Sequence, residues 1–191
     1  EYQQKLKNGN SVDFDDLLIL PIKLFRNYPR VLEEYQDRYK YILIDEYQDT
    51  NEAQYTFSKL LSAKYRNIFV VGDNDQAIYA FRGANYKNIL NFEKDYPEAK
   101  TILLEENYRS TKTILNAANS VIKNNHERKD KNLWSNNATG NKIKYKEVAN
   151  EKEEASFVGT EIKRLLSEGI NEEDIAVLYR TNAQSRVIEE E

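Results

Sequence analysis

Cysteine is absent from the chain, and only six glycines, three prolines, one tryptophan and one histidine occur among its 191 residues. Without cysteine the protein can form neither a disulfide nor a thiolate metal site, which agrees with a reducing compartment. No apolar run approaches the roughly 18 residues that a membrane span needs, and no segment resembles a signal peptide. We therefore expect a soluble, cytoplasmic protein with no membrane partner.

Charge and the two ends of the sequence give weaker constraints. The formal net charge is −4, and 40% of the residues are hydrophobic, which excludes a disordered chain. The acidity argues against a uniformly basic nucleic-acid binder, although a local groove on an acidic protein can still be positive. Glu1 in place of a methionine, and a helix-like ending from Arg186 to Glu191, predict a piece of a longer protein.

One stretch joins a hydrophobic run to a pair of carboxylates. Tyr41 to Ile44 is apolar, and Asp45 and Glu46 follow it directly. Such a run is typical of a buried strand in a parallel sheet, whose chemistry lies at the carboxyl ends of its strands. There one carboxylate can hold Mg²⁺ while its neighbour accepts a proton from an attacking water, as in a Walker B motif. Taken alone, the pattern also fits a strand followed by a solvated acidic turn.

The segment that follows repeats the strand pattern. We expect a helix capped by Thr50 or Asn51, and then a second buried strand at 68–71 that ends at Gly72 and Asp73. A strand, a helix and a strand in this order predict a βαβ unit with parallel strands. The two strand ends should therefore lie near each other.

Further elements are expected on either side of this unit. Apolar periodicity predicts helices at about 13–25, 29–39, 85–94, 111–122 and 151–168, and strands at 101–104, 142–148 and 175–178. We interpret Asp13, Asp15 and Asp16 as a helix start rather than a metal site. Residues 123–141 are typical of a long polar loop. Pro97 precedes a new strand and is the expected domain boundary.

Three motifs stand in order along the chain. The first runs from Asp45 to Asn51 (DEYQDTN), the second from Val71 to Ala84 (VGDNDQAIYAFRGA) and the third from Leu104 to Thr111 (LEENYRST). They closely resemble motifs II, III and IV of the superfamily 1 DNA helicases of the UvrD/Rep/PcrA type, most closely the PcrA group of Gram-positive bacteria. Asp13 to Leu18 and Leu178 to Asn182 are also similar to segments of that family, so the likeness covers nearly the whole chain.

The resemblance implies an α/β fold of the P-loop NTPase (RecA-like) type, with parallel sheets flanked by helices in two incomplete lobes. Residues 1–97 would be the C-terminal part of the first, ATP-binding lobe, with the end of a helical insertion at 1–12. Residues 98–191 would be the N-terminal part of the second lobe.

The same resemblance assigns roles to residues of the ATP site. Asp45 would engage the Mg²⁺ bound to ATP, Glu46 would orient and deprotonate the hydrolytic water, and Gln76 would sense the γ-phosphate. Arg109 would act as an arginine finger across the cleft between the lobes, and Tyr108 would stack on the adenine. By residue type alone, Gln76 also fits a polar turn residue, Arg109 a surface ion pair and Tyr108 a core tyrosine.

Tyr79, Phe81 and Arg82 are the expected single-stranded DNA contacts. Aromatic rings interleaved with a cation can stack on unpaired bases of any sequence while the cation meets the backbone. Tryptophan often occupies the position of Phe81 in the family, so we expect weaker stacking here. The alternative is an aromatic side chain tucked into the core beneath a loop.

The polar loop leaves two interpretations open. Trp134 either anchors the loop against a core, which burial statistics favour, or faces DNA. The loop and the segment after it are locally basic, a pattern that most often marks only a solvated surface, through Lys123, Arg128, Lys129, Lys131, Lys142, Lys144 and Lys146. We assign no role to His126.

No Gly-x-x-x-x-Gly-Lys-Ser/Thr loop, which would cradle nucleotide phosphates, occurs in the sequence, and family order puts that loop before Glu1. The resemblance implies a fragment of an ATP-dependent DNA helicase that moves 3′ to 5′ on single-stranded DNA and separates the duplex at a junction, in repair or replication. The fragment alone is expected to be inactive. The alternatives are a helicase-nuclease subunit and a DNA-binding or partner-binding module without hydrolysis, and the presence of both Asp45 and Glu46 argues against the module.

Overall fold

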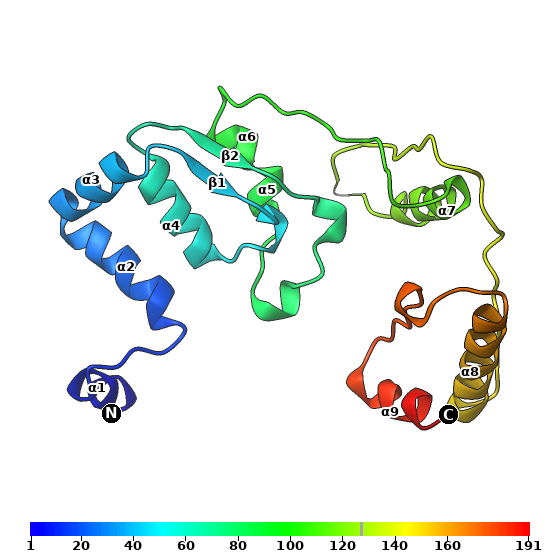
Figure 1. The fold of residues 1–191 in the computed structure, drawn as a ribbon. Helices are drawn as coiled ribbons and strands as arrows, with labels where there is room; N and C mark the ends of the chain where they lie inside the picture. The colour runs from blue at the N-terminus through cyan, green and yellow to red at the C-terminus, as the bar shows by residue number, and fades with distance from the viewer. Residues whose placement is uncertain (127) are drawn as a thin grey trace. The chain divides into compact units, whose positions relative to one another are not determined.

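The computed structural model describes residues 1–126 and 128–191, which divide into the compact units Glu1–Gly140 and Asn141–Glu191 (Figure 1). In chain order the first unit contains α1 (Tyr2–Asn8), α2 (Asp16–Asn27), α3 (Pro29–Arg38), β1 (Ile42–Ile44), η1 (Tyr47–Asp49), α4 (Glu52–Ser62), β2 (Ile68–Val70), η2 (Asn74–Gln76), η3 (Ala80–Arg82), α5 (Lys87–Leu90), α6 (Phe92–Asp95) and α7 (Lys112–Ile122). The second contains α8 (Glu151–Ser167), η4 (Glu172–Asp174) and α9 (Asn182–Glu190). The η elements are single 3₁₀ turns.

Two short parallel strands, β1 and β2, form the sheet of the first unit, and α4 connects them. Ile44 pairs with Val70, and the backbone N–H of Val71 donates to the carbonyl of Ile44 at 2.9 Å. Just past the strands, the N–H of Tyr47 donates to the carbonyl of Val71 at 2.9 Å. The predicted βαβ unit is confirmed, and because its strands are parallel their carboxyl ends share one edge.

The helix starts follow the predicted capping chemistry. The N–H of Asp16 donates to Asp13 Oδ1 at 2.8 Å, so the acidic cluster does begin α2. At α4, Asn51 Oδ1 accepts from the N–H of Gln54 and Gln54 Oε1 accepts from the N–H of Asn51, both at 2.9 Å, which is a capping box. Pro29 opens α3, where its missing N–H leaves no helical hydrogen bond unmade.

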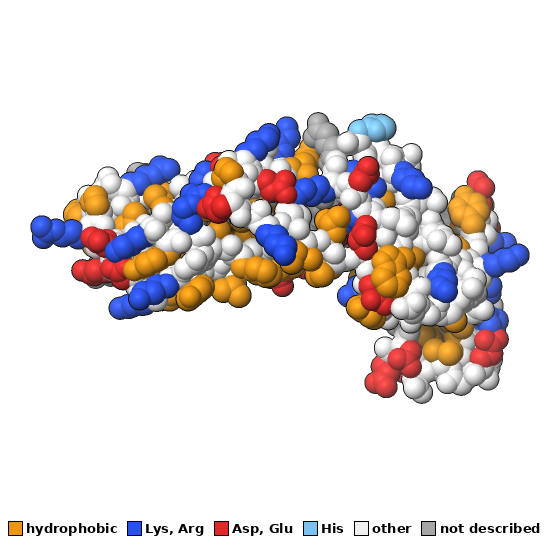
Figure 2. All heavy atoms as spheres, turned by 90° about the horizontal axis from the view of Figure 1, so that it is seen from above, with side chains coloured by type: hydrophobic (Ala, Val, Ile, Leu, Met, Phe, Trp, Pro, Cys, Tyr) orange, Lys and Arg blue, Asp and Glu red, His pale blue; other side chains and the backbone are white. Residues whose placement is uncertain are grey.

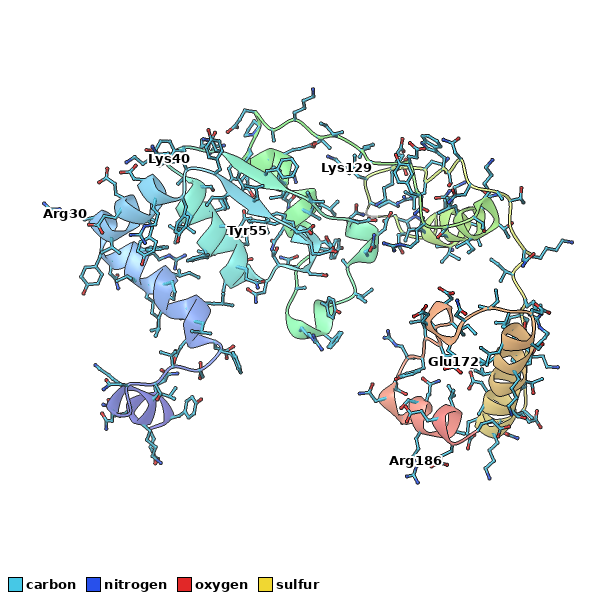
Figure 3. All side chains as sticks on the ribbon, viewed as in Figure 1. Arg30, Lys40, Tyr55, Lys129, Glu172 and Arg186 are labelled. Atoms are coloured by element: carbon cyan, nitrogen blue, oxygen red, sulfur yellow. The ribbon has the colours of Figure 1, made fainter. Side chains whose placement is uncertain are left out.

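Aromatic side chains hold α4 in the first unit. Phe57 of α4 stacks on Phe25 of α2, with ring centroids 5.7 Å apart. Tyr55, labelled in Figure 3, lies on the same helix, and its hydroxyl donates to Asp95 Oδ2 at 2.5 Å. The fully buried Tyr47 meets the edge of Phe92, with centroids 5.8 Å apart. These contacts fix the residues that follow β1 against α4 and α6.

Three predicted strands are not formed. Residues 101–104, 142–148 and 175–178 pair with no strand in the described parts of the chain. An apolar run favours burial, but a strand also needs a neighbouring backbone to complete its hydrogen bonds, and no described segment pairs with these runs as a strand. Leu178 is accordingly 94% exposed. The second parallel sheet expected within 98–191 is therefore missing from the described residues.

The helix predicted at 85–94 is divided into α5 and α6. Asn91 separates them, with φ −90° and ψ −1°, outside the range of a regular α-helix. Its side-chain Oδ1 accepts a hydrogen bond from Lys94 Nζ at 2.9 Å. Asparagine has a lower helix propensity than most residues of a helix interior, a preference that apolar periodicity does not register.

In the second unit α9 packs on α8. Asn150 Oδ1 caps α8 by accepting from the N–H groups of Lys152 at 3.1 Å and Glu153 at 3.0 Å. After α8 the chain turns at Gly169, with φ +89°, and the N–H of Gly169 donates to the carbonyl of Leu166 at 3.0 Å. Glycine suits this left-handed conformation, because it has no Cβ, and it ends the helix here.

The surface carries many apolar side chains between its charges. Figure 2 shows hydrophobic side chains interspersed with Lys, Arg, Asp and Glu over the visible face. Leu43 and Phe69, the central residues of β1 and β2, are 73% and 61% exposed, so the prediction that both strands are buried is wrong for this face of the sheet. None of the helices in the described ranges is both long enough and apolar enough to cross a bilayer.

Candidate ATP and DNA site

The carboxylates after β1 lie on a tight, left-handed turn. Asp45 and Glu46 are both exposed, and Glu46 has φ 50° and ψ 43°, a conformation that few residues other than glycine adopt. Asp45 Oδ1 accepts a hydrogen bond from the N–H of Glu46 at 2.9 Å. The turn leads at once into η1 and presents the two carboxylates at the edge of the sheet.

Gln48 links this turn to the end of β2. Its buried amide donates from Nε2 to Glu46 Oε2 at 2.7 Å and accepts at Oε1 from the N–H of Asp73 at 2.9 Å. Gly72 makes this approach possible, because a Cβ there would lie 2.6 Å from Gln48 Oε1. The sequence analysis assigned no role to Gln48. Its position within the first motif was the one feature of the sequence that could have indicated a role.

Gln76 lies on η2, directly after β2. Its side-chain Nε2 donates to Asp73 Oδ2 at 2.9 Å, so Gln48, Asp73 and Gln76 form a connected series. Burial alone would raise the pKa of Asp73, but hydrogen bonds from Lys131 and Gln76 outweigh it and hold the pKa below its ordinary value. Glu46 and Gln76, predicted to belong to one site, are thus linked through the Gln48 side chain and through Asp73, whose backbone N–H bonds Gln48 and whose carboxylate bonds Gln76.

A cavity of about 380 Å³ borders the first motif. Asp45, Glu46 and Asp49 line it together with residues of α4. Asp49 Oδ1 is buried and has no hydrogen-bond partner among the residues that the structure describes. Within the described residues no group of three or more His, Cys, Asp or Glu side chains could hold a metal by itself. Because Mg²⁺ is commonly held by one or two carboxylates plus phosphate oxygens, Asp45 and its neighbours fit a nucleotide-bound Mg²⁺.

The predicted DNA contacts lie together on the loop around η3. The Tyr79 and Phe81 rings are 6.1 Å apart, and the Arg82 guanidinium lies 5.1 Å from the first ring and 5.4 Å from the second. Phe81 is 79% exposed, so it is not tucked into a core. The loop therefore offers two aromatic rings and a cation to a ligand.

The base of this loop is bonded to the end of the first motif. The N–H of Asn85 donates to the carbonyl of Thr50 at 2.9 Å, and Asn51 and Ala84 form an isolated antiparallel bridge. The buried Asn88 side chain adds a bond from Nδ2 to the Thr50 carbonyl at 3.2 Å. A displacement of the Asp45–Thr50 segment would thus move the aromatic loop with it.

Tyr108 and Arg109 lie on the turn that opens α7. Asn107 Oδ1 accepts from the N–H groups of Arg109 at 3.0 Å and Ser110 at 2.8 Å. Tyr108 is exposed, with its hydroxyl donating to Glu106 Oε2 at 2.8 Å, so it is not a core tyrosine here. The exposed Arg109 side chain makes no ion pair in the described chain, and no bond joins it to Glu46 or Gln76.

The polar loop after α7 is anchored at Trp134 by its backbone. The Trp134 N–H donates to the Glu105 carbonyl at 3.0 Å, and its carbonyl accepts from Asn107 N–H at 2.8 Å. The indole itself is about half-exposed. Two basic residues of this loop, Arg128 and Lys131, are largely buried against Asp73 and Asp75, so for them the predicted solvated surface is wrong.

Comparison with known proteins identifies the family. Residues 1–97 match the UvrD/REP helicase N-terminal domain, and residues 102–191 match the UvrD-like helicase C-terminal domain. The chain is 60% identical over 189 residues to an ATP-dependent DNA helicase PcrA of Staphylococcus aureus and 57% identical to that of Staphylococcus epidermidis. Each alignment covers 99% of this chain and 26% of the relative, so the chain spans about a quarter of their length. The predicted resemblance is confirmed, and the chain belongs to the UvrD/Rep helicase family.

Proposed function

We propose that the chain is part of an ATP-dependent DNA helicase that couples ATP hydrolysis to movement along single-stranded DNA and duplex separation. The observation that carries this proposal is the bonded series Glu46, Gln48, Asp73 and Gln76, which joins the ends of β1 and β2. The similar staphylococcal proteins are ATP-dependent DNA helicases, which supports the proposal. Movement from 3′ to 5′ and a role in repair or replication belong to the same proposal.

The fold proposal is that residues 1–97 and 98–191 are parts of two RecA-like lobes of the P-loop NTPase type. The parallel β1–β2 pair with its α4 crossover supports this for the first lobe. The helicase-domain matches, which divide between residues 97 and 102, support the same boundary.

Hydrolysis would use both carboxylates after β1. Glu46 Oε2 is occupied by the Gln48 amide, while Oε1 has no hydrogen-bond partner in the described part of the chain and is free to accept a proton. Asp45 would hold the Mg²⁺, which supplies charge neutralisation at the phosphate oxygens. Gln76, fixed by Asp73, would contact the γ-phosphate from the neighbouring strand end.

Residues of the third motif would complete the nucleotide contacts, and residues of the second would contact DNA. The exposed Arg109 guanidinium, which makes no ion pair in the described part of the chain, is suited to phosphate oxygens, and the exposed Tyr108 ring is suited to stacking on adenine. Tyr79, Phe81 and Arg82 would contact unpaired DNA at the junction. Because this loop is bonded to Thr50, changes at the carboxylates would reach the DNA contacts through one short segment.

The test is Glu46→Gln in the intact helicase. The amide keeps the size of the side chain but cannot accept the proton, so DNA-stimulated ATP turnover should fall by about 10²–10⁴-fold while ATP binding is retained. Glu52→Gln, an exposed change in the first turn of α4, is the matched control and should stay near wild type. Unchanged ATP turnover in Glu46→Gln would show that Glu46 is not the general base.

A further inference from the structure

Four charged side chains form a buried ionic cluster beside η2. Arg128 Nη2 lies 3.0 Å from Asp75 Oδ2, and the two side chains are only 7% and 8% exposed. Lys131 Nζ contacts Asp73 Oδ1 and lies 3.6 Å from Asp75 Oδ2. We call Asp73, Asp75, Arg128 and Lys131 the ionic cluster.

The cluster joins segments that lie far apart in the sequence. Asp73 and Asp75 follow β2, whereas Arg128 and Lys131 belong to the polar loop after α7, which Lys129 marks in Figure 3. Arg128 Nη2 also donates to the Lys131 carbonyl at 3.2 Å, so the two basic residues hold the loop's own turn together. Charges buried to this degree are stabilised only while their partners are present.

On one side the cluster reaches Gln76. Asp73 Oδ1 is engaged by Lys131 and by the N–H of Asp75 at 2.9 Å, while Asp73 Oδ2 accepts from Gln76 Nε2 at 2.9 Å. Lys131 therefore fixes the carboxylate that orients Gln76. Without Lys131, Asp73 could rotate and Gln76 would lose its fixed acceptor.

On the other side the same loop reaches the turn of Tyr108 and Arg109. Three residues after Lys131, Trp134 exchanges backbone hydrogen bonds with Glu105 and Asn107. Asn107 Oδ1 in turn accepts from the N–H of Arg109. Gln76 is therefore linked to the Arg109 turn by the contacts of Asp73 and Lys131, by the chain from Lys131 to Trp134, and by the contacts of Trp134 and Asn107.

We propose that Arg128 and Lys131 are positioning residues that hold the Gln76 turn and couple it to the Tyr108–Arg109 turn through the ionic cluster. The inference rests on the proposed role of Gln76 in sensing the γ-phosphate. Neither basic residue touches nucleotide in this account; each acts through an aspartate of the second motif.

The test is a double-mutant cycle in the intact helicase. Lys131→Gln should lower the kcat of DNA-stimulated ATP hydrolysis by about tenfold with little change in the KM for ATP, within the range of coupling between contacting residues. Lys131→Arg, which keeps the charge, should restore most of the kcat. Lys129→Gln, in the same loop but in an exposed pair with Glu93, is the control and should stay within about twofold of wild type.

The decisive readout is the combination with Gln76→Ala. If Lys131 acts through Gln76, the double variant should lose no more kcat than Gln76→Ala alone. If the kcat losses of the two single variants multiply in the double variant, the proposal is overturned, because Lys131 would then act independently of Gln76. If Lys131→Gln does not fold, Arg128→Gln provides the same cycle, because Lys131 Nζ still lies 3.6 Å from Asp75 Oδ2, and multiplicative losses there also overturn the proposal. Failure of the proposed function can be told apart from failure of this inference. If the proposed function is wrong, Glu46→Gln leaves ATP turnover unchanged, whatever the result of the double-mutant cycle.

Discussion

Two adjacent residues, Glu46 and Tyr47, combine strain with burial at the end of β1. The left-handed backbone of Glu46 costs a residue with a side chain about 1–2 kcal/mol. Tyr47 is completely buried, and its hydroxyl has no hydrogen-bond partner in the described chain. Strained backbone of this kind persists where the surroundings hold it in place, and here Gln48 and the Tyr47 ring hold the turn that presents Glu46.

Tyr47→Phe tests the burial directly. Removing a hydroxyl that has no partner should leave the free energy of unfolding unchanged or raise it by about 1–2 kcal/mol. Burial raises the pKa of Tyr47 to about 12 from 10.0, so wild type should lose stability as pH rises from 10 towards 12, by about 1.4 kcal/mol per unit from this residue. Below pH 10 the contribution is fully present, because the tyrosine is neutral in both states.

Denaturant titrations of both proteins at pH 8, 10 and 11 provide the measurement. The difference between them isolates Tyr47, because the other 13 of the 14 tyrosines are common to both. A phenylalanine variant that loses stability as steeply as wild type above pH 10 would contradict the raised pKa.

At the scale of elements, α4 and the segment before it connect the parts of the site. The capping box at Asn51 fixes where α4 begins, and the preceding residue, Thr50, accepts bonds from Asn85 and Asn88. The start of α4, the carboxylate turn and the base of the aromatic loop therefore share one short backbone segment. A backbone displacement in any of them is expected to reach the others.

Asn51→Ala should weaken this junction. Loss of the side-chain acceptor at the N-cap is expected to lower the free energy of unfolding by about 1 kcal/mol. Asn51→Asp keeps an acceptor at the same position and should remain close to wild type. Thermal or denaturant unfolding of the two variants is the measurement, and equal stability of alanine and aspartate would argue against the cap.

Local patterns predicted the elements whose signals are themselves local. The strand before Asp45 and the helix cap at Asn51 each depend on a few neighbouring residues, and the structure agrees with both predictions. The run at 101–104 could not be assigned in this way, because a strand depends on a partner elsewhere. The contacts of Gln48 with Asp73 and of Lys131 with the same residue join positions 25 and 58 residues apart, which no local pattern records.

At the scale of the whole chain, the boundary between the two helicase-domain matches differs from the boundary between the two compact units. The helicase-domain matches divide between residues 97 and 102, whereas the compact units divide after Gly140. The ionic cluster is one reason, because it ties the polar loop to the residues after β2. The boundary near Pro97 stays a prediction about the two lobes.

The most direct test of the account is DNA-dependent ATP hydrolysis, measured in one assay for the intact helicase and for the 191-residue chain, with Mg²⁺ and single-stranded DNA. The chain holds the carboxylates, Gln76 and Arg109 but no phosphate-cradling glycine loop. We therefore predict turnover that rises with DNA for the intact protein and none above background for the chain alone. An intact protein without DNA-dependent turnover, or a 191-residue chain that hydrolyses ATP, would contradict the account.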